Sequence, residues 1–221
     1  MQITQQLLKE KLEAGLHYQS IELSDLQIQQ LLDYINLLEK WNKVYNLTSI
    51  KDKRKMVILH LLDSLSILNK IKSLASQFDH KLRIIDVGTG GGLPGIPLSI
   101  CLPEVDFTLL DARDKKIRFL KQVSTSLQLK NVQTIHSRVE DYVPELKLDM
   151  VITRAFSSLI DMLGICSHLC HTNGFFLAMK GKQPVEEISQ IPEHYIMQSM
   201  QALQVYQLYA ERHLLVIQEK S

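Results

Sequence analysis

The pattern of apolar and polar positions divides the chain into a helical first part and an alternating second part. In the stretch DLQIQQLLDYINLLEKWNKVYN, apolar side chains recur at helical spacing, and Ser24 directly before it is a good helix N-cap. A second apolar pattern of helical period predicts a helix from about Met56 to Lys72. We therefore expect roughly the first 80 residues to be helical.

From Leu82 onward, short apolar runs alternate with helical patterns. The runs that predict strands are 82–87, 106–111, 132–136, 148–153 and 174–180. The helical patterns between them cover about 95–102, 114–128 and 158–171. This alternation is typical of a parallel sheet with helices on both faces. The tail differs, because 195–208 and 212–218 are two strand-like runs with only a short turn between them.

These elements predict an α/β fold with a Rossmann-like, mostly parallel seven-stranded sheet. The two tail strands would close the sheet as an antiparallel hairpin. We expect an N-terminal helical extension over 1–80 and a Rossmann-like domain over 81–221. No Pro-rich linker separates the two parts, so the extension is expected to pack directly on the sheet domain.

Composition restricts the class of protein but not its function. Of the 221 residues, 45% are hydrophobic and 22% are charged, and the net charge of +1 neither favours nor excludes nucleic acid. An odd number of cysteines, three, suits a reducing compartment. The chain starts with a polar stretch, and no apolar run approaches the roughly 20 residues that span a bilayer. We expect a cytoplasmic protein without a membrane segment.

A glycine-rich loop follows the first predicted strand in RIIDVGTGGGLPGIPLSI, from Arg83 to Ile100. The segment from Gly90 to Gly95 matches GxGxxG, but this spelling alone is weak evidence for a dinucleotide. Asp86 ends the strand, and a carboxylate there would repel a pyrophosphate and favour a ligand with an ammonium and a sulfonium.

Two more acidic positions follow the next predicted strands. Asp111 ends DFTLLDA, where a carboxylate can accept both hydroxyls of a ribose. Glu140 and Asp141 follow the third strand, where polar groups can contact an adenine edge. Ligands of α/β sheets bind at these carboxyl ends. The polar residues at these three strand ends are suited to contact a cationic amino acid, a ribose and an adenine. Together they predict a binding site for a methyl donor.

Six motifs together resemble the bacterial ribosomal RNA small-subunit methyltransferase G family, formerly called glucose-inhibited division protein B. They are DVGTGGGLPGIPLSI, HSRVED, TRAF, MKG, WNKVYNLTSI and HLLDSL. The resemblance runs from about Leu38 to the closing ERHLLVI. It implies a class I methyltransferase fold, S-adenosyl-L-methionine as cofactor, and N7 of guanine 527 in 16S rRNA of the small ribosomal subunit as acceptor. We expect a monomer.

The resemblance also assigns cofactor contacts to particular positions. They fall on Gly88, Leu93, Val139, Glu140 and Arg154. Asp111 takes the ribose role that is usual in this fold. Leu93 stands where many relatives have Phe, so a stacking contribution is lost there. Leu59 stands where relatives often carry a basic residue.

Methylation at guanine N7 needs no general base, because that nitrogen carries a lone pair and no proton. The chain after the fourth strand, TRAF, lacks the Asn/Asp-Pro-Pro-aromatic motif of amino-group methylation, and no Pro-Cys nucleophile is present. We therefore assign no firm catalytic residue, and Arg154 is a candidate for positioning the acceptor or the cofactor.

The candidates for RNA contact lie near the ends of the fourth and fifth strands. Phe156 is a candidate for stacking on an extruded base, and Lys180 and Lys182 are candidates for phosphate contacts. Two basic runs, 51–55 and 113–121, are further candidates, although such runs are often ordinary solvated surface.

Two other groups of polar residues favour structure over chemistry. His60, Asp63 and Ser64 have the letters of a hydrolase triad but lie within one helical turn. Cys166 and Cys170 suggest zinc by composition, yet their spacing on an apolar helix predicts core packing, and we expect no metal. His171 is expected at the end of that helix, before Asn173-Gly174 stops it.

Three other functions stay open from the residues alone. The GxGxxG spelling allows an NAD(P)-dependent oxidoreductase, although Asp86 argues against it. A small-molecule methyltransferase is disfavoured by the helical extension and the basic runs. A non-catalytic RNA- or ribosome-binding protein on a methyltransferase scaffold is the third alternative.

Overall fold

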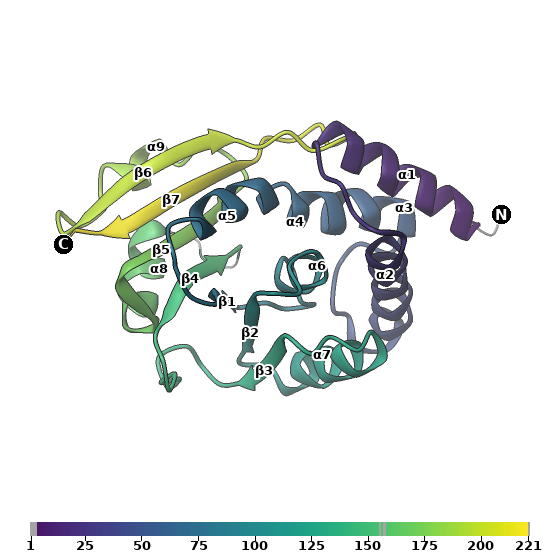
Figure 1. The fold of residues 1–221 in the computed structure, drawn as a ribbon, viewed down its shortest axis with the longest axis horizontal. Helices are drawn as coiled ribbons and strands as arrows, with labels where there is room; N and C mark the ends of the chain where they lie inside the picture. The colour runs from purple at the N-terminus through teal and green to yellow at the C-terminus, as the bar shows by residue number, and fades with distance from the viewer. Residues whose placement is uncertain (1–3, 155, 157, 221) are drawn as a thin grey trace.

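A seven-stranded sheet organises the computed structural model, which describes residues 4–154, 156 and 158–220. The strands are β1 (Arg83–Val87), β2 (Asp106–Asp111), β3 (Val132–His136), β4 (Leu148–Thr153), β5 (Cys170–Lys180), β6 (Tyr195–Ala202) and β7 (His213–Glu219). Their order is β3-β2-β1-β4-β5-β7-β6, in which the first five are parallel and β7 pairs antiparallel with both neighbours. The predicted sheet and its closing hairpin are confirmed (Figure 1).

Helices cover both faces of this sheet. Those before the first strand are α1 (Gln5–Tyr18), α2 (Asp25–Tyr45), α3 (Lys53–Met56), the π-helix η1 (Val57–Leu62), α4 (Asp63–Leu65) and α5 (Leu68–Ala75). Those after it are α6 (Gly95–Cys101), α7 (Asp114–Ser126), α8 (Leu159–Cys166), the 3₁₀-helix η2 (Ser167–Leu169) and α9 (Val185–Ile188). In the described part of the chain, no helix is long and apolar enough to cross a membrane.

The N-terminal helices share their core with the sheet. The main apolar cluster joins side chains of α1, α2, α5, α6 and α7 to one face of the sheet, such as Leu12, Leu38 and Ile84. The second cluster joins the opposite face to α8, with Val151 and Leu163 among its members. The helical part therefore packs directly on the sheet, while the boundary between 1–80 and 81–221 stays a prediction.

The start of α2 follows the sequence signal. Ser24 accepts a hydrogen bond from the backbone N–H of Gln27, whose side chain accepts one from the N–H of Ser24. This capping box satisfies N–H groups that a helix start leaves without partners. Asn46, in the left-handed conformation, ends the helix.

Two predicted helices have different limits in the structure. The helix expected over Met56 to Lys72 is interrupted, because 57–62 is π-helical and α5 begins at Leu68. The helix expected over 158–171 is also too long, since α8 ends at Cys166 and β5 already begins at Cys170. The Asn173-Gly174 pair lies inside β5, where the register with β4 shifts, and does not stop a helix.

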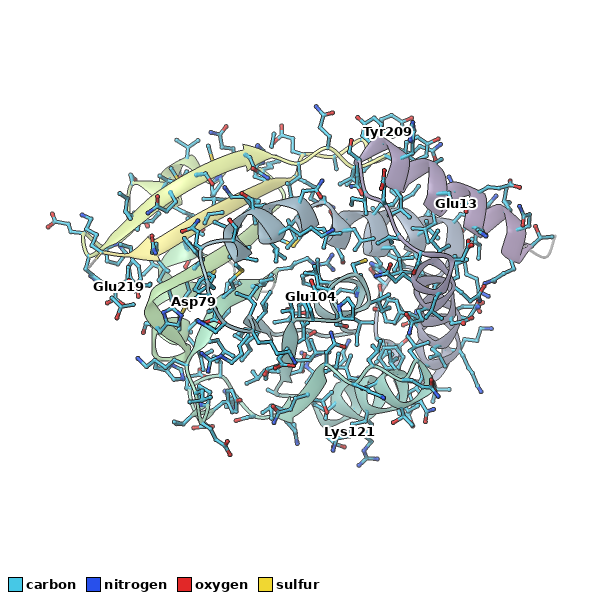
Figure 2. The ribbon with its side chains drawn as sticks, in the orientation of Figure 1. Glu13, Asp79, Glu104, Lys121, Tyr209 and Glu219 are labelled. Carbon is cyan, nitrogen blue, oxygen red and sulfur yellow. The ribbon has the colours of Figure 1, made fainter. Side chains whose placement is uncertain are left out.

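The connection between β6 and β7 is longer than the predicted turn. It spans 203–212 and passes beside α1, where Tyr18 donates a hydrogen bond to Gln204 at 3.0 Å (Figure 1). Tyr209, 98% exposed, projects from this connection, and Lys121 projects from α7 (Figure 2). The connection places the residues just before β7 next to the N-terminal helices.

Candidate functional site

The glycine loop between β1 and α6 is held from two sides. The N–H groups of Gly88 and Thr89 donate to the carbonyl of Leu110 on β2, at 2.9 and 3.1 Å. The hydroxyl of Tyr34 on α2 donates to the carbonyl of Gly91 at 2.8 Å. Tyr34 is fully buried, and burial raises the pKa of its hydroxyl, which therefore stays a donor at neutral pH. The sheet and the N-terminal helices thus position the loop together.

Asp86 lies beneath this loop and is 1% exposed. Its Oδ2 accepts hydrogen bonds from the hydroxyl of Thr89 at 2.7 Å and from the N–H of Gly95 at 2.8 Å. Its Oδ1 is buried and has no hydrogen-bond partner among the described residues. Burial raises the pKa of this carboxyl to about 6, although both hydrogen bonds and Arg154 act in the opposite direction.

Asp111 connects the end of β2 to the same loop. Its Oδ2 accepts from the N–H of Gly90, and its Oδ1 accepts from the N–H of Arg113, both at 2.9 Å. The residue is only 9% exposed, so its carboxylate is largely shielded from solvent. Each oxygen keeps a second acceptor direction.

The loop leaves open space beside Gly90 and an unpaired carboxylate oxygen beneath it. Gly88 and Gly90 have φ of +68° and +60°, and a Cβ at Gly90 would meet only the Gly88 carbonyl, at 3.9 Å. The space beside Gly90 is therefore open to a ligand. The unsatisfied Oδ1 of Asp86 would accept a hydrogen bond from an ammonium group, and leaving such an atom unpaired costs about 1–3 kcal/mol. The residues present fit S-adenosylmethionine.

The other predicted cofactor positions surround the loop unevenly. Gly88 and Glu140 are exposed, Val139 is half-buried in the turn after β3, and Leu93 is 7% exposed within the main core. Arg154 follows the end of β4 and is half-buried. All five lie at the carboxyl side of the parallel strands, as the sequence predicts.

Arg154 is part of an ion-pair cluster with residues distant in sequence. Its Nη1 donates to Oδ2 of Asp63 at 2.9 Å, and Nε of Arg212 donates to Oδ1 of Asp63 at 2.7 Å. Asp63, at the start of α4, is 3% exposed. The cluster joins the helical extension to the end of β4 and the start of β7.

A cavity of about 390 Å³ opens beside this cluster. It is lined by Asp63, Arg154, Lys180 and Arg212, together with apolar side chains and His60. His60 is 6% exposed, and its Nε2 lies 2.9 Å from the hydroxyl of Thr48. Burial, and secondarily Arg154, lower the pKa of His60 to about 4, so the ring is neutral at neutral pH. His60 and Asp63 of the apparent triad thus have other partners, and the buried hydroxyl of Ser64 has no hydrogen-bond partner among the described residues.

The candidates for RNA contact differ in exposure. Lys182 is exposed. Lys180 pairs with Glu187 at 2.8 Å and donates to the carbonyl of Phe156 at 3.4 Å. Phe156 is half-buried and packs against the second core cluster. Lys182 is therefore the most accessible of the three.

One basic run includes a buried residue. Lys116 on α7 is 8% exposed, and its Nζ donates to the carbonyl of Leu47 at 2.6 Å. Lys115 donates to the carbonyl of Tyr45 at 3.3 Å. The suggestion that Lys116 lies on an RNA-facing surface was wrong, because this lysine attaches α7 to the segment that follows α2.

The cysteines are core residues. Cys101, Cys166 and Cys170 are all buried, and burial raises the pKa of each thiol to about 12. Among the described residues no group of three or more His, Cys, Asp or Glu side chains is arranged to hold a metal ion. His171 lies in β5, so its predicted position at the end of a helix was wrong. Its Nε2 is 2.9 Å from Asp149.

Sequence reasoning did not assign Tyr34, His60, Asp63 or Arg212 to the site. It considered His60 and Asp63 only as letters of a hydrolase triad and interpreted them as structural. Polar side chains on otherwise apolar helix faces were the available signal for the first three. Nothing in the local pattern distinguishes Arg212 from the other arginines.

Comparisons with known proteins identify the family of this chain. A family model described as rRNA small subunit methyltransferase G matches residues 27–215. A ribosomal RNA small subunit methyltransferase G of Idiomarina loihiensis is 45% identical over 214 residues, which is 97% of this chain and 100% of the relative. Another from Enterobacter sp. is 49% identical over 207 residues, 94% of this chain and 96% of the relative.

The solved structures support the fold. The ribosomal protein L11 methylase of Lactobacillus delbrueckii subsp. bulgaricus superposes with a TM-score of 0.53 at 14% identity, covering 72% of this chain and 77% of that one. At this identity the similarity concerns the arrangement of helices and strands alone.

Proposed function

The chain belongs to the rRNA small subunit methyltransferase G family, and from this membership we propose that it methylates N7 of guanine 527 in 16S rRNA, with S-adenosyl-L-methionine as donor. The observation that carries the proposal is the family match over 27–215, which includes the glycine loop, the three strand ends and Arg154. The fold is that of a class I methyltransferase with a helical extension.

The cofactor would lie across the ends of β1, β2 and β3. Gly88 and Leu93 would contact it from the loop, Asp86 would face its ammonium, and Asp111 would accept its ribose hydroxyls. The turn with Val139 and Glu140 would contact the adenine. Bound there, the cofactor supplies an electrophilic methyl group on a sulfonium.

The residues of the chain need only orient the acceptor. N7 of guanine would accept the methyl group through its own lone pair, so the residues of the chain would hold the base in line with the donor. No proton leaves N7, so a general base is not required, and alignment supplies much of the rate enhancement. Arg154, between the glycine loop and the cavity, is suited to positioning the cofactor or the base.

RNA contact is proposed for Lys182, Lys180 and Phe156 on the same edge. We also propose that the enzyme acts as a monomer in the cytoplasm, with 1–80 as an extension of the methyltransferase domain 81–221. The shared apolar core supports treating both parts as one folding unit.

The test is methyl transfer from radiolabelled S-adenosylmethionine to rRNA from cells that lack this protein, followed by mapping of the labelled nucleotide. Label on N7 of guanine 527 is expected. Gly88→Val should abolish transfer, because a branched side chain at φ of +68° distorts the loop. Gly164→Ala, on the exposed side of α8, is the matched control.

Three outcomes would contradict the proposal in whole or in part. Tight binding of NADH without binding of S-adenosylmethionine would favour an oxidoreductase. Binding of rRNA without methyl transfer by the wild-type protein would favour a non-catalytic RNA-binding protein, and unchanged transfer by the Gly88→Val variant would show that the glycine loop does not hold the cofactor.

A further inference from the structure

The cluster of Asp63, Arg154 and Arg212 contains more positive than negative charge. Two guanidinium groups face one carboxylate, so the cluster carries a net positive charge. Lys180 nearby is paired with Glu187, and His60 is neutral at neutral pH. A half-buried excess of positive charge favours an anionic or acceptor-rich occupant of the adjacent cavity.

Arg212 keeps donors for such an occupant. Its Nε binds Asp63, and its Nη1 donates to the carbonyl of Glu211 at 2.8 Å. Its Nη2 has no partner in the described part of the chain. The side chain is 24% exposed and lines the cavity. It is therefore held firmly on one side and free to donate on the other.

The cavity has the dimensions and walls of a nucleotide site. Its volume of about 390 Å³ lies in the range of small-molecule pockets. Ile50, Leu59 and Met179 provide an apolar part of the lining beside the charged part. A flat base with polar edges and an attached phosphate matches this combination.

The position of the cavity connects it to the methyl-donor site. Arg154 follows β4, Lys180 ends β5, and Arg212 directly precedes β7, which runs antiparallel, so all three lie at one edge of the sheet. Arg154 also lies near enough to Asp86 to lower its pKa. An occupant of the cavity would thus lie next to the cofactor.

We propose that Arg212 binds the acceptor nucleotide of the RNA through its oxygen atoms, and that Asp63 positions Arg212 and Arg154 together. This inference rests on the proposed rRNA methyltransferase function. The oxygens are those of a backbone phosphate or O6 of the guanine, which a guanidinium recognises in the same way. Asp63 itself is nearly inaccessible, so it acts through the two arginines.

The test compares Arg212→Gln and Arg212→Lys with the wild-type enzyme. Arg212→Gln should lower kcat/KM for rRNA by about ten- to a hundredfold, mainly through KM, because one good contact to a nucleotide is lost. The Kd for S-adenosylmethionine should stay within about twofold, since Arg154 keeps Asp63 as its partner. Arg212→Lys, which preserves the charge, should recover part of the loss.

Arg83→Gln is the matched control. Arg83 has a similar exposure of 27% and also faces a buried carboxylate, Asp149 at 3.6 Å, but at the opposite edge of the sheet. It should leave kcat/KM for rRNA within about twofold. Thermal unfolding of all variants identifies any loss of folding. If Arg212→Gln does not fold, the kcat/KM of Arg212→Lys is compared with that of the wild type instead.

Binding measurements distinguish the two oxygen sources. If Arg212 contacts a phosphate, the variant's salt dependence of RNA binding is shallower by about one counterion. If it contacts O6, the wild-type enzyme prefers RNA with the target guanine over RNA with adenine there, and Arg212→Gln loses this preference.

Two results would overturn the inference about Arg212. One is wild-type kcat/KM and RNA affinity in folded Arg212→Gln. The other is an equal loss of affinity for S-adenosylmethionine and for RNA, which indicates a structural role alone. If the proposed function fails, the wild-type protein binds rRNA without transferring methyl groups. The role of Arg212 is then still decided by comparing the RNA affinities of the wild type and the variants.

Discussion

The hydroxyl of Tyr34 donates a 2.8 Å hydrogen bond to the carbonyl of Gly91, across 57 residues of sequence. This bond makes the helical extension part of the cofactor loop's support. A buried carbonyl that loses its donor remains unsatisfied, which gives the contact a measurable effect.

Tyr34→Phe should lower the free energy of unfolding by about 1–2 kcal/mol and weaken S-adenosylmethionine binding severalfold. The ring still fills its place in the core, so the change isolates the hydroxyl. Calorimetric titration and thermal unfolding measure both effects. Tyr18→Phe removes an exposed hydroxyl bonded to Gln204 and should change neither. Equal behaviour of the two variants would show that the Gly91 contact has no role in cofactor binding.

Asp86 should make the stability of the protein depend on pH. Its pKa is 3.8 in the unfolded chain and about 6 in the folded one. The unfolded state therefore ionises first as pH rises from about 4 to 6, and the folded state loses up to about 3 kcal/mol relative to it over that range. Asp86→Asn removes this loss. Urea unfolding from pH 4 to 7 should show that the free energy of unfolding of the variant increases relative to that of the wild type. If the two free energies change with pH in parallel, the prediction is contradicted.

The affinity for S-adenosylmethionine should also depend on the ionisation of Asp86, but it should increase with pH, whereas the stability decreases. An ammonium beside Asp86 favours the ionised carboxylate, so affinity for S-adenosylmethionine should rise between pH 5 and 7. In Asp86→Asn the affinity should be lower and nearly constant over this range. A wild-type affinity that does not change with pH would argue that the ammonium binds elsewhere.

A second pH-dependent group lies at the opposite edge of the sheet. His80 and His171 both bond to Oδ1 of the buried Asp149, at 3.0 and 2.9 Å. Burial alone would raise the pKa of Asp149, but hydrogen bonds from His80, the Arg83 N–H and His171 lower it. The bond to Asp149 raises the pKa of His80.

The contribution of His80 and Asp149 to the free energy of unfolding should be greatest between about pH 4 and 6.5. His80 stabilises the fold below its unfolded pKa of 6.5 and loses this effect as pH rises through its higher folded value. Asp149 stabilises above 3.8 and loses its effect as pH falls through its lower folded value. His80→Ala should flatten the decline in unfolding free energy above pH 6.5, whereas the exposed His17→Ala should not. If the unfolding free energy of His80→Ala declines above pH 6.5 as steeply as that of the wild type, the pairing of His80 with Asp149 does not stabilise the fold.

Two glycine-to-alanine changes should have opposite effects. A Cβ at Gly95 would lie 2.2 Å from Leu109 and 2.8 Å from Oδ2 of Asp86, so Gly95→Ala should cost about 1–3 kcal/mol through overpacking. A Cβ at Gly164 would meet nothing within 4 Å, and Gly164→Ala should gain about 0.5–1 kcal/mol as a helix former. Thermal unfolding checks both, and a stabilised Gly95→Ala would contradict the close packing of this loop.

The sequence by itself determined the features that depend on neighbouring residues. Helical and strand periods predicted the alternation from β1 to β5, Ser24 predicted the start of α2, and Asp86 and Asp111 marked the strand ends at the candidate site. Each of these signals arises from backbone geometry within a few residues, so it can be recognised without the fold.

Only the tertiary structure decided which distant side chains meet. Arg154 and Arg212 lie 91 and 149 residues after Asp63 along the chain, and both donate to its carboxylate. The burial of Lys116 and the early start of β5 at Cys170 likewise depend on what packs beside them. The spacing of apolar residues does not predict these contacts, because ion pairs and strand register are determined when distant elements pack around a common core.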